Sequence, residues 1–199
     1  NLNFLTTHIT ITHMIDNIQN AIETLKSGGT ILYPTDTIWG IGCDATNEEA
    51  CQKIMDIKKR PENKSFVLLA DSFNMVELYI PDFADVVYDL VDLSTRPLTI
   101  IYPNARKLAP SVLAEDGSIG IRITTDPTCL KLIHGMRKPL VSTSANLSGE
   151  NFGKNYGEIS EDIKSKVDFC LKERVNEQLN IPSQIIKVDL DGTVEIIRK

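Results

Sequence analysis

Histidine is scarce in this 199-residue chain, which carries only three, and no Ser-His-Asp or Cys-His arrangement can be assembled from them. No stretch approaches the roughly 18–20 apolar residues that a membrane-spanning helix needs, so no membrane contact is expected. The start of the chain also lacks the basic-then-apolar pattern of a secretory signal. Histidine-dependent catalysis and histidine-based metal binding are therefore not expected, and no side chains are identified as metal ligands.

The four cysteines form no Cys-x-x-Cys pair, and their spacing argues against a zinc site or a redox motif. We expect them to be buried thiols in a reducing compartment, and we expect the protein to be cytoplasmic. The glycine-rich patterns of P-loops and of dinucleotide-binding folds are also absent. A nucleotide, if one binds, must therefore be held by cationic side chains and hydroxyl-bearing loops.

A net charge of −6 argues against nucleic-acid binding through a generally basic surface. Apolar residues make up 42% of the chain and charged residues 24%, as in an ordinary globular domain. The chain shows no internal repeat, low-complexity tract or linker. We therefore expect one domain over residues 1–199, with residues 1–13 as a partly flexible N-terminal segment.

The periodicity of apolar residues predicts a mixed α/β domain in which helices alternate with strands. Thr46 and Glu49 form a capping-box pattern at one helix start, and Asp126 followed by Pro127 is typical of another. Asp191-Gly192 predicts a two-residue turn between the last two strands. The predicted helices cover residues 14–27, 46–59, 72–79, 82–90 and 126–136. The predicted strands cover residues 30–33, 66–70, 98–102, 119–123, 140–143, 185–188 and 194–197.

Polar residues directly follow a predicted strand in the segment Pro34-Thr35-Asp36-Thr37. Loops at the strand ends of open α/β sheets commonly bind ligands, so these side chains are candidate binding groups. The segment is equally consistent with a tight turn in which Asp36 bonds its own backbone.

Positive charge clusters in a second segment, where a predicted helix ends and a proline-stiffened loop begins. The cluster contains Lys58, Lys59, Arg60 and Lys64. The planar fork of arginine and the point charge of lysine both suit phosphate oxygens. The alternative is a solvated helix end, at which cations complement the helix dipole.

Small hydroxyl and amide side chains follow another predicted strand, in the segment Ser142-Thr143-Ser144-Ala145-Asn146. Their donors are candidates for holding phosphate or carboxylate oxygens. The alternative is a turn rich in serine and asparagine.

A fourth group combines Ser118 and Arg122 with the later residues Ser183 and Arg198. Because Arg122 lies in a predicted strand, it needs an acidic partner or an anionic ligand if it points inward. The alternative is an outward-facing salt bridge.

Taken together and in this order, the four segments resemble those of the YrdC-like family of threonylcarbamoyl-AMP synthases, over about residues 15–198. The resemblance implies an α/β fold with a twisted mixed sheet, flanked by helices, around a large positively charged cavity. It implies that L-threonine, bicarbonate and ATP react to give threonylcarbamoyl-AMP and pyrophosphate, with Mg²⁺ on the triphosphate and no organic cofactor. The product serves threonylcarbamoyladenosine modification of tRNA, which a separate transferase complex completes.

The resemblance also implies a role for each matching position. Lys58 and Arg60 would be the catalytic residues. The threonine-binding residues would be Thr35, Thr37, Arg122, Ser142 and Ser183. The nucleotide-binding residues would be Lys58, Arg60, Lys64, Ser118, Thr143, Ser144, Asn146 and Arg198. One departure from the family is Leu69, which stands where longer relatives carry a histidine that touches threonine.

Two alternatives stay open at this point. A protein of the same fold could bind tRNA or double-stranded RNA in the basic cavity without catalysis, although the net charge argues against it. A related enzyme could adenylate a carbamoyl group taken from carbamoyl phosphate, a role that usually comes with additional domains. The synthase is the main expectation, because the Lys-x-Arg and Ser-x-Asn patterns are both present.

Overall fold

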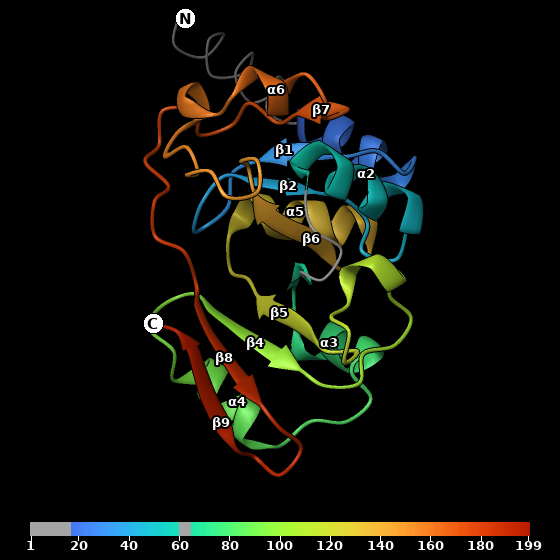
Figure 1. Cartoon of the computed structure of the whole chain (residues 1–199), viewed down its shortest axis with the longest axis vertical. Coiled ribbons are helices and arrows are strands. Elements are labelled where there is room, and N and C mark those ends of the chain that lie inside the picture. The colour runs from blue at the N-terminus through green and yellow to red at the C-terminus, as the bar shows by residue number, and fades with distance from the viewer. Residues whose placement is uncertain (1–16, 60–64) are drawn as a thin grey trace, which may run out of the picture.

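The computed structural model describes residues 17–59 and 65–199, so the predicted N-terminal segment, residues 1–13, lies outside it (Figure 1). A first helix covers residues 17–26. The other helices are α2 (Glu48–Lys58), α3 (Phe73–Tyr79), α4 (Val86–Asp92), α5 (Pro127–Met136), α6 (Glu161–Lys164) and the 3₁₀ turns η1 (Pro110–Val112) and η2 (Tyr156–Glu158). The strands are β1 (Ile31–Tyr33), β2 (Gly40–Gly42), β3 (Val67–Ala70), β4 (Leu98–Tyr102), β5 (Ile119–Ile123), β6 (Leu140–Ser144), β7 (Phe169–Cys170), β8 (Gln184–Val188) and β9 (Val194–Arg198). None of these described helices has both the length and the apolar character that crossing a membrane takes.

The nine strands of the described residues form one sheet in the order β7-β1-β2-β6-β3-β5-β4-β8-β9. Three neighbouring pairs, β1 with β7, β3 with β5 and β4 with β8, are parallel, and the other five are antiparallel. Strands that are far apart in the sequence therefore lie side by side. In Figure 1 the sheet divides into an upper part around β1, β2 and β6 and a lower part of β4, β5, β8 and β9. This arrangement confirms the mixed α/β fold that the sequence predicts.

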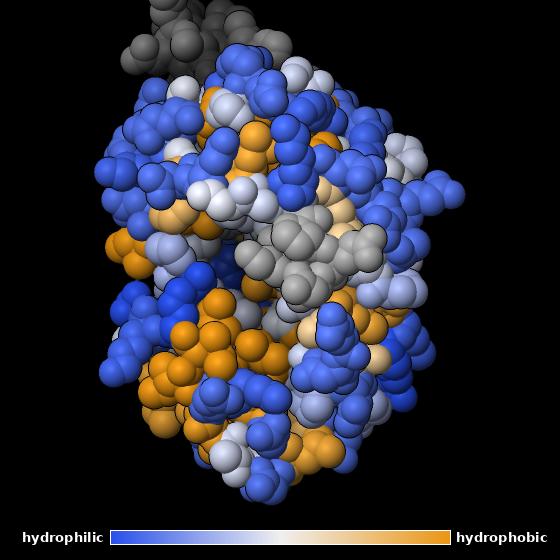
Figure 2. Space-filling model, in the orientation of Figure 1, coloured by the Kyte–Doolittle hydropathy of each residue, from blue (hydrophilic) through white to orange (hydrophobic). Residues whose placement is uncertain are grey.

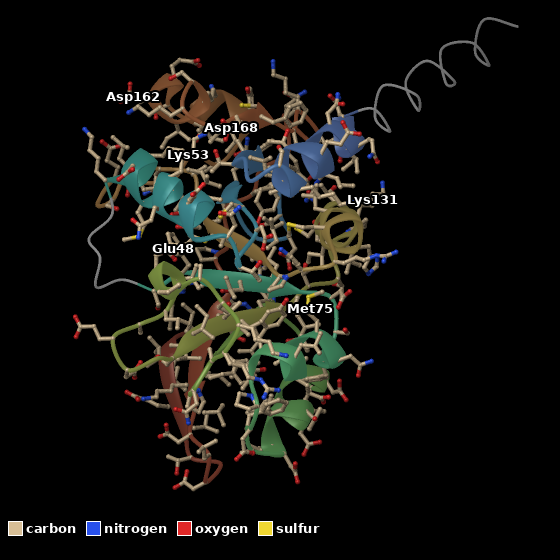
Figure 3. All side chains as sticks on the ribbon, turned by 90° about the vertical axis from the view of Figure 1, so that its right-hand side faces the viewer. Glu48, Lys53, Met75, Lys131, Asp162 and Asp168 are labelled. Atoms are coloured by element: carbon tan, nitrogen blue, oxygen red, sulfur yellow. The ribbon has the colours of Figure 1, made fainter. Side chains whose placement is uncertain are left out.

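Helices cover the two parts of the sheet differently. Helices α2 and α5 lie beside the upper part, whereas α3 and α4 lie against one face of the lower part (Figures 1 and 3). Val76 of α3 and Val87 of α4 are buried in that contact layer. The opposite face of β4 and β8 is turned towards the viewer in Figure 1, and its side chains border the cavity described below.

Close packing around β1 sets the geometry of the upper part. Ile31, Leu32 and Tyr33 are fully buried, as expected for a strand that is covered on both faces. The Tyr33 hydroxyl donates a hydrogen bond to the backbone oxygen of Val141 at 3.1 Å. A Cβ atom added at Gly42 would lie 2.5 Å from the same oxygen and 2.7 Å from the Tyr33 ring. Glycine is therefore required at position 42 for β1, β2 and β6 to pack together.

Several element bounds agree with the sequence prediction. Strands β4 and β5 have the predicted ends, and α5 begins where expected because Asp126 caps it. The Asp126 Oδ1 accepts hydrogen bonds from the backbone amides of Thr128 and Cys129 at 2.9 and 3.0 Å.

Helix α4 differs from the prediction, since it begins at Val86 rather than at residue 82. Strands β2 and β7 are not predicted, because a Gly-Ile-Gly triplet and a two-residue strand leave no alternating pattern.

The predicted start of α2 is wrong by two residues. The helix begins at Glu48, and its cap is Asn47, whose Oδ1 accepts a hydrogen bond from the Ala50 amide at 3.1 Å. Thr46 does not form the predicted capping box, because its hydroxyl donates to Asp44 Oδ1 at 2.7 Å instead. A nearby carboxylate therefore competes successfully for the threonine hydroxyl.

The predicted two-residue turn between β8 and β9 is also wrong. The Asp189 amide donates to the Thr193 oxygen, and the Gly192 amide donates to the Asp189 oxygen, both at 3.0 Å. Three residues thus separate the paired positions. A two-residue type I′ turn needs positive φ at both central residues, whereas only Gly192 of the Asp191-Gly192 pair has it, at 85°.

We predict that Asn47→Ala lowers the free energy of unfolding by about 1 kcal/mol, because the Ala50 amide loses its capping acceptor. The matched control is Glu49→Gln, at the exposed position of the unused capping box, for which a change within about 0.5 kcal/mol is expected. Urea denaturation measures both values. Equal losses for the two variants would contradict the assignment of Asn47 as the cap.

Candidate functional site

A cavity of about 350 Å³ opens between the upper and lower parts of the sheet, and Figure 2 shows the surface hollowed there. Its walls come from the loop between β1 and β2, from β3, β5 and β6, and from β4, β8 and β9. The sheet order thus places segments from both ends of the chain around one space. The predicted site residues that line this cavity are Thr37, Arg122, Ser142, Thr143, Ser144, Ser183 and Arg198.

Arg122 is the most constrained charged group of the cavity. Its side chain is only 3% exposed, and its NH1 donates to Asp36 Oδ1 at 2.6 Å. Its buried Nε has no hydrogen-bond partner among the described residues. An outward-facing salt bridge is therefore excluded, because the buried guanidinium lines the cavity, and the described residues bond only one of its five N–H donors, to Asp36. A buried donor of this kind favours an anionic ligand in the cavity.

A second guanidinium reaches the cavity from β9. The Arg198 Nε donates to the backbone oxygen of Ser183 at 2.9 Å, and its NH2 lies 3.3 Å from the Ser183 hydroxyl. That hydroxyl is also 2.8 Å from the Thr99 hydroxyl. Burial, and secondarily the charge of Arg122, lower the pKa of Arg198. Two cationic groups thus lie near enough to influence each other, and an anion between them would relieve that repulsion.

The loop between β1 and β2 presents Thr37 to the cavity. The Thr35 hydroxyl oxygen accepts hydrogen bonds from the amides of Thr37 and Ile38 at 3.0 and 3.2 Å, and donates to the Ile38 oxygen at 2.7 Å. Thr35, and not Asp36, therefore makes the tight turn with its side chain, and Asp36 is left to bind Arg122. Thr35 itself does not line the cavity but supports Thr37, whose hydroxyl lies 2.9 Å from its own.

Lys58 lies behind the cavity wall and not on its surface. Its side chain is buried in α2, and its Nζ donates to the backbone oxygens of Asn146, at 2.6 Å, and Ser144. The Ser148 amide donates back to the Lys58 oxygen at 2.9 Å. Lys58 therefore holds the loop that follows β6, and a solvated helix end is excluded for it. Arg60 and Lys64 lie outside the described residues, so their roles stay predictions.

Three further positions lie away from the cavity lining. Ser118 precedes β5, and its amide donates to Asp116 Oδ1 at 3.0 Å. The Asn146 Nδ2 donates to the backbone oxygens of Leu147 and Glu150, which closes the loop after β6. Leu69 is fully buried and pairs with Arg122 across β3 and β5, so an apolar side chain stands beside the guanidinium.

Some residues of the cavity lining were not predicted from the sequence. Thr99 is a polar residue within the apolar strand β4, and this interruption is a usable signal for a residue that faces a site. Phe66, Phe152 and Ile185 give the cavity an apolar portion, for which no local pattern provides a signal. Arg174, which contacts the Thr35 backbone from outside the cavity, is likewise without a motif.

These features define an α/β protein with a hydroxyl-rich cavity that is lined by two guanidiniums. Within the described residues, no group of three or more His, Cys, Asp or Glu side chains is placed to hold a metal ion. The family model described as "Telomere recombination", for Sua5, YciO and YrdC proteins, matches residues 23–199. The chain therefore belongs to the Sua5/YciO/YrdC family.

Curated relatives agree with this assignment. The threonylcarbamoyl-AMP synthase of Pseudoalteromonas translucida (strain TAC 125) is 32% identical over 180 residues, which cover 89% of this chain and 95% of the relative. The protein of the same name from Vibrio vulnificus (strain YJ016) is 30% identical over 183 residues, which cover 86% of this chain and 94% of the relative.

Two solved structures show the same fold. Sua5 of P. abyssi, complexed with L-threonine, has a TM-score of 0.78 at 22% identity over 86% of this chain. Since only 50% of that Sua5 chain is covered, the present chain spans about half of its length. YciO of E. coli has a TM-score of 0.77 at 24% identity, with 92% of this chain and 88% of the other covered. The YrdC-like fold expected from the sequence is thereby confirmed.

We predict that Lys58→Met lowers the free energy of unfolding by about 3 kcal/mol, because two buried backbone oxygens lose their cationic donor. Lys53→Met is the matched control on the same helix. It breaks an exposed ion pair with Asp168, visible in Figure 3, for which a loss of about 0.5 kcal/mol is expected. Urea denaturation compares the variants, and a Lys58→Met loss no larger than the control would refute the buried role of Lys58.

Proposed function

We propose that this protein is an L-threonylcarbamoyl-AMP synthase, a nucleotidyltransferase that makes threonylcarbamoyl-AMP and pyrophosphate from L-threonine, bicarbonate and ATP. The observation that carries the proposal is the inward-facing Arg122, a buried guanidinium with one donor bonded to Asp36, in a cavity that also holds Arg198. The names of the relatives support the same reaction. The product would pass to a separate transferase complex that modifies tRNA.

The amino-acid side of the reaction follows from the groups around Arg122. The threonine carboxylate would accept hydrogen bonds from the Arg122 guanidinium and from Arg198, since paired guanidinium donors suit a carboxylate. The hydroxyls of Thr37 and Ser183 line the same space and would orient the substrate. Leu69, beside Arg122, offers apolar contact at most.

The chemistry needs positioning more than a protein nucleophile. Bicarbonate gives carbon dioxide and hydroxide. The threonine amine attacks the carbon dioxide and becomes a carbamate, and the proton that it loses combines with the hydroxide as water. A carbamate oxygen then attacks the α-phosphorus of ATP, and the bond to pyrophosphate breaks. Fixed cations and hydroxyls would align the two anions and offset the charge that develops on phosphate.

The nucleotide side uses the other wall of the cavity. Thr143 and Ser144 at the end of β6 offer hydroxyls for phosphate oxygens, and Phe66 and Phe152 give an apolar surface that suits adenine. Arg60 and Lys64 are proposed for the triphosphate from the family pattern. Lys58 is proposed to act there by holding the Ser144 loop in place. Mg²⁺ would enter with the triphosphate as part of the substrate.

The experiment is a pyrophosphate-release assay in which threonine, bicarbonate and ATP are omitted in turn. We predict that release requires all three and that Arg122→Met lowers kcat/KM for threonine at least about 100-fold, because a buried charge-assisted contact is lost. Arg106→Met is the matched control, since the guanidinium of the exposed Arg106 contacts only backbone oxygens of α3 among the described residues, and the variant should keep full activity.

A paired variant separates function from folding. Arg122→Met leaves Asp36 without its partner, so Arg122→Met with Asp36→Asn removes both charges together. The double variant should fold and stay inactive. Pyrophosphate release that ignores threonine, or that proceeds with carbamoyl phosphate in place of threonine and bicarbonate, would overturn the proposed function.

A further inference from the structure

Residues 171–183, here called the connecting segment, join β7 to β8 and run from the upper to the lower part of the molecule (Figure 1). Asn180 of this segment forms an isolated β-bridge with Ile38 in the loop between β1 and β2. Ser183 at its end contacts Arg198 in the cavity. The segment therefore touches both the loop that carries Thr37 and the cavity itself.

Arg174 is the charged anchor of the connecting segment. Its NH1 donates to Asp126 Oδ2 at 2.6 Å, and its NH2 donates to the backbone oxygen of Thr35 at 3.2 Å. The Nε and NH2 of the same guanidinium pair with the Glu177 carboxylate. Arg174 has a φ of 53°, in the left-handed region that non-glycine residues rarely adopt, so its contacts must outweigh that strain.

The partners of Arg174 connect a rigid element to the cavity loop. Asp126 is buried, and its other oxygen caps α5, so the carboxylate is fixed in position. Arg174 holds Thr35 through its backbone oxygen. The Thr35 hydroxyl oxygen in turn accepts hydrogen bonds from the amides of Thr37 and Ile38. Asp36, between the two threonines, is the partner of Arg122. One guanidinium outside the cavity thus restrains the loop that supplies two of its lining residues, Thr37 and Ile38.

We propose that Arg174 is a positioning residue that holds the loop of residues 35–38 in the geometry that binds the amino-acid substrate. The inference rests on the proposed function for the identity of that substrate, but not for the mechanical role. Arg174 does not line the cavity, so an effect of replacing it on binding must be transmitted through its partners, of which Thr35 belongs to the cavity loop.

The first test is amide hydrogen exchange without any ligand. Arg174→Met is expected to speed exchange of the Thr37 and Ile38 amides about tenfold, since the turn that protects them loses its anchor. Lys138→Met is the matched control, because it breaks a 2.6 Å ion pair with the similarly buried Asp44 elsewhere in the fold. Unchanged exchange in Arg174→Met, or equal acceleration in both variants, would overturn the positioning role.

The second test is calorimetric titration with threonine and, separately, with ATP. Arg174→Met should raise the Kd for threonine about tenfold while the Kd for ATP changes less than about twofold, and Lys138→Met should change neither. Loss of both affinities in parallel would mark a general structural effect and contradict the proposal. If the wild-type protein binds no threonine, the proposed function fails, and the exchange experiment still decides the role of Arg174.

Discussion

The buried ion pair between Arg122 and Asp36 is the constraint around which the cavity is built. A guanidinium that is 3% exposed loses most of its hydration, and such a loss is tolerated only with a close charged partner. Asp36 supplies that partner through a single 2.6 Å contact, which leaves the Nε donor unused. The pair therefore stabilises the positive charge in the interior, and the Asp36 contact takes up only one of the five N–H donors that could bind a substrate anion.

The sheet makes this arrangement possible by bringing distant segments together. Arg122 comes from β5 and Asp36 from the loop after β1, while Arg198 arrives on β9 at the far edge. Two residues behind the walls, Lys58 and Arg174, each bind backbone oxygens of a loop that faces the cavity. Both loops are thus supported from outside the cavity. Such support limits the motion of the side chains that the loops place in the cavity.

Local signals in the sequence were sufficient for much of this molecule and failed for identifiable reasons. The apolar runs of β4 and β5 and the cap at Asp126 depend on neighbouring residues alone, so their bounds were predictable. The hydroxyls and Arg122 were recognisable as ordered motifs, and the cavity brings most of them together. The burial of Lys58 depends on oxygens more than 80 residues away, and Arg174 acts through a backbone oxygen, so neither role has a local sequence signal.

The most direct test of this account is a crystal structure of the protein with L-threonine and a non-hydrolysable ATP analogue. The account predicts that the threonine carboxylate lies within hydrogen-bonding distance of the Arg122 guanidinium, about 2.7–2.9 Å, and beside Arg198, with the Arg122–Asp36 pair intact. The α-phosphate should face the threonine amine from the side of β6. A threonine carboxylate bound away from Arg122, or an Arg122 that leaves Asp36 to turn out of the cavity, would contradict it.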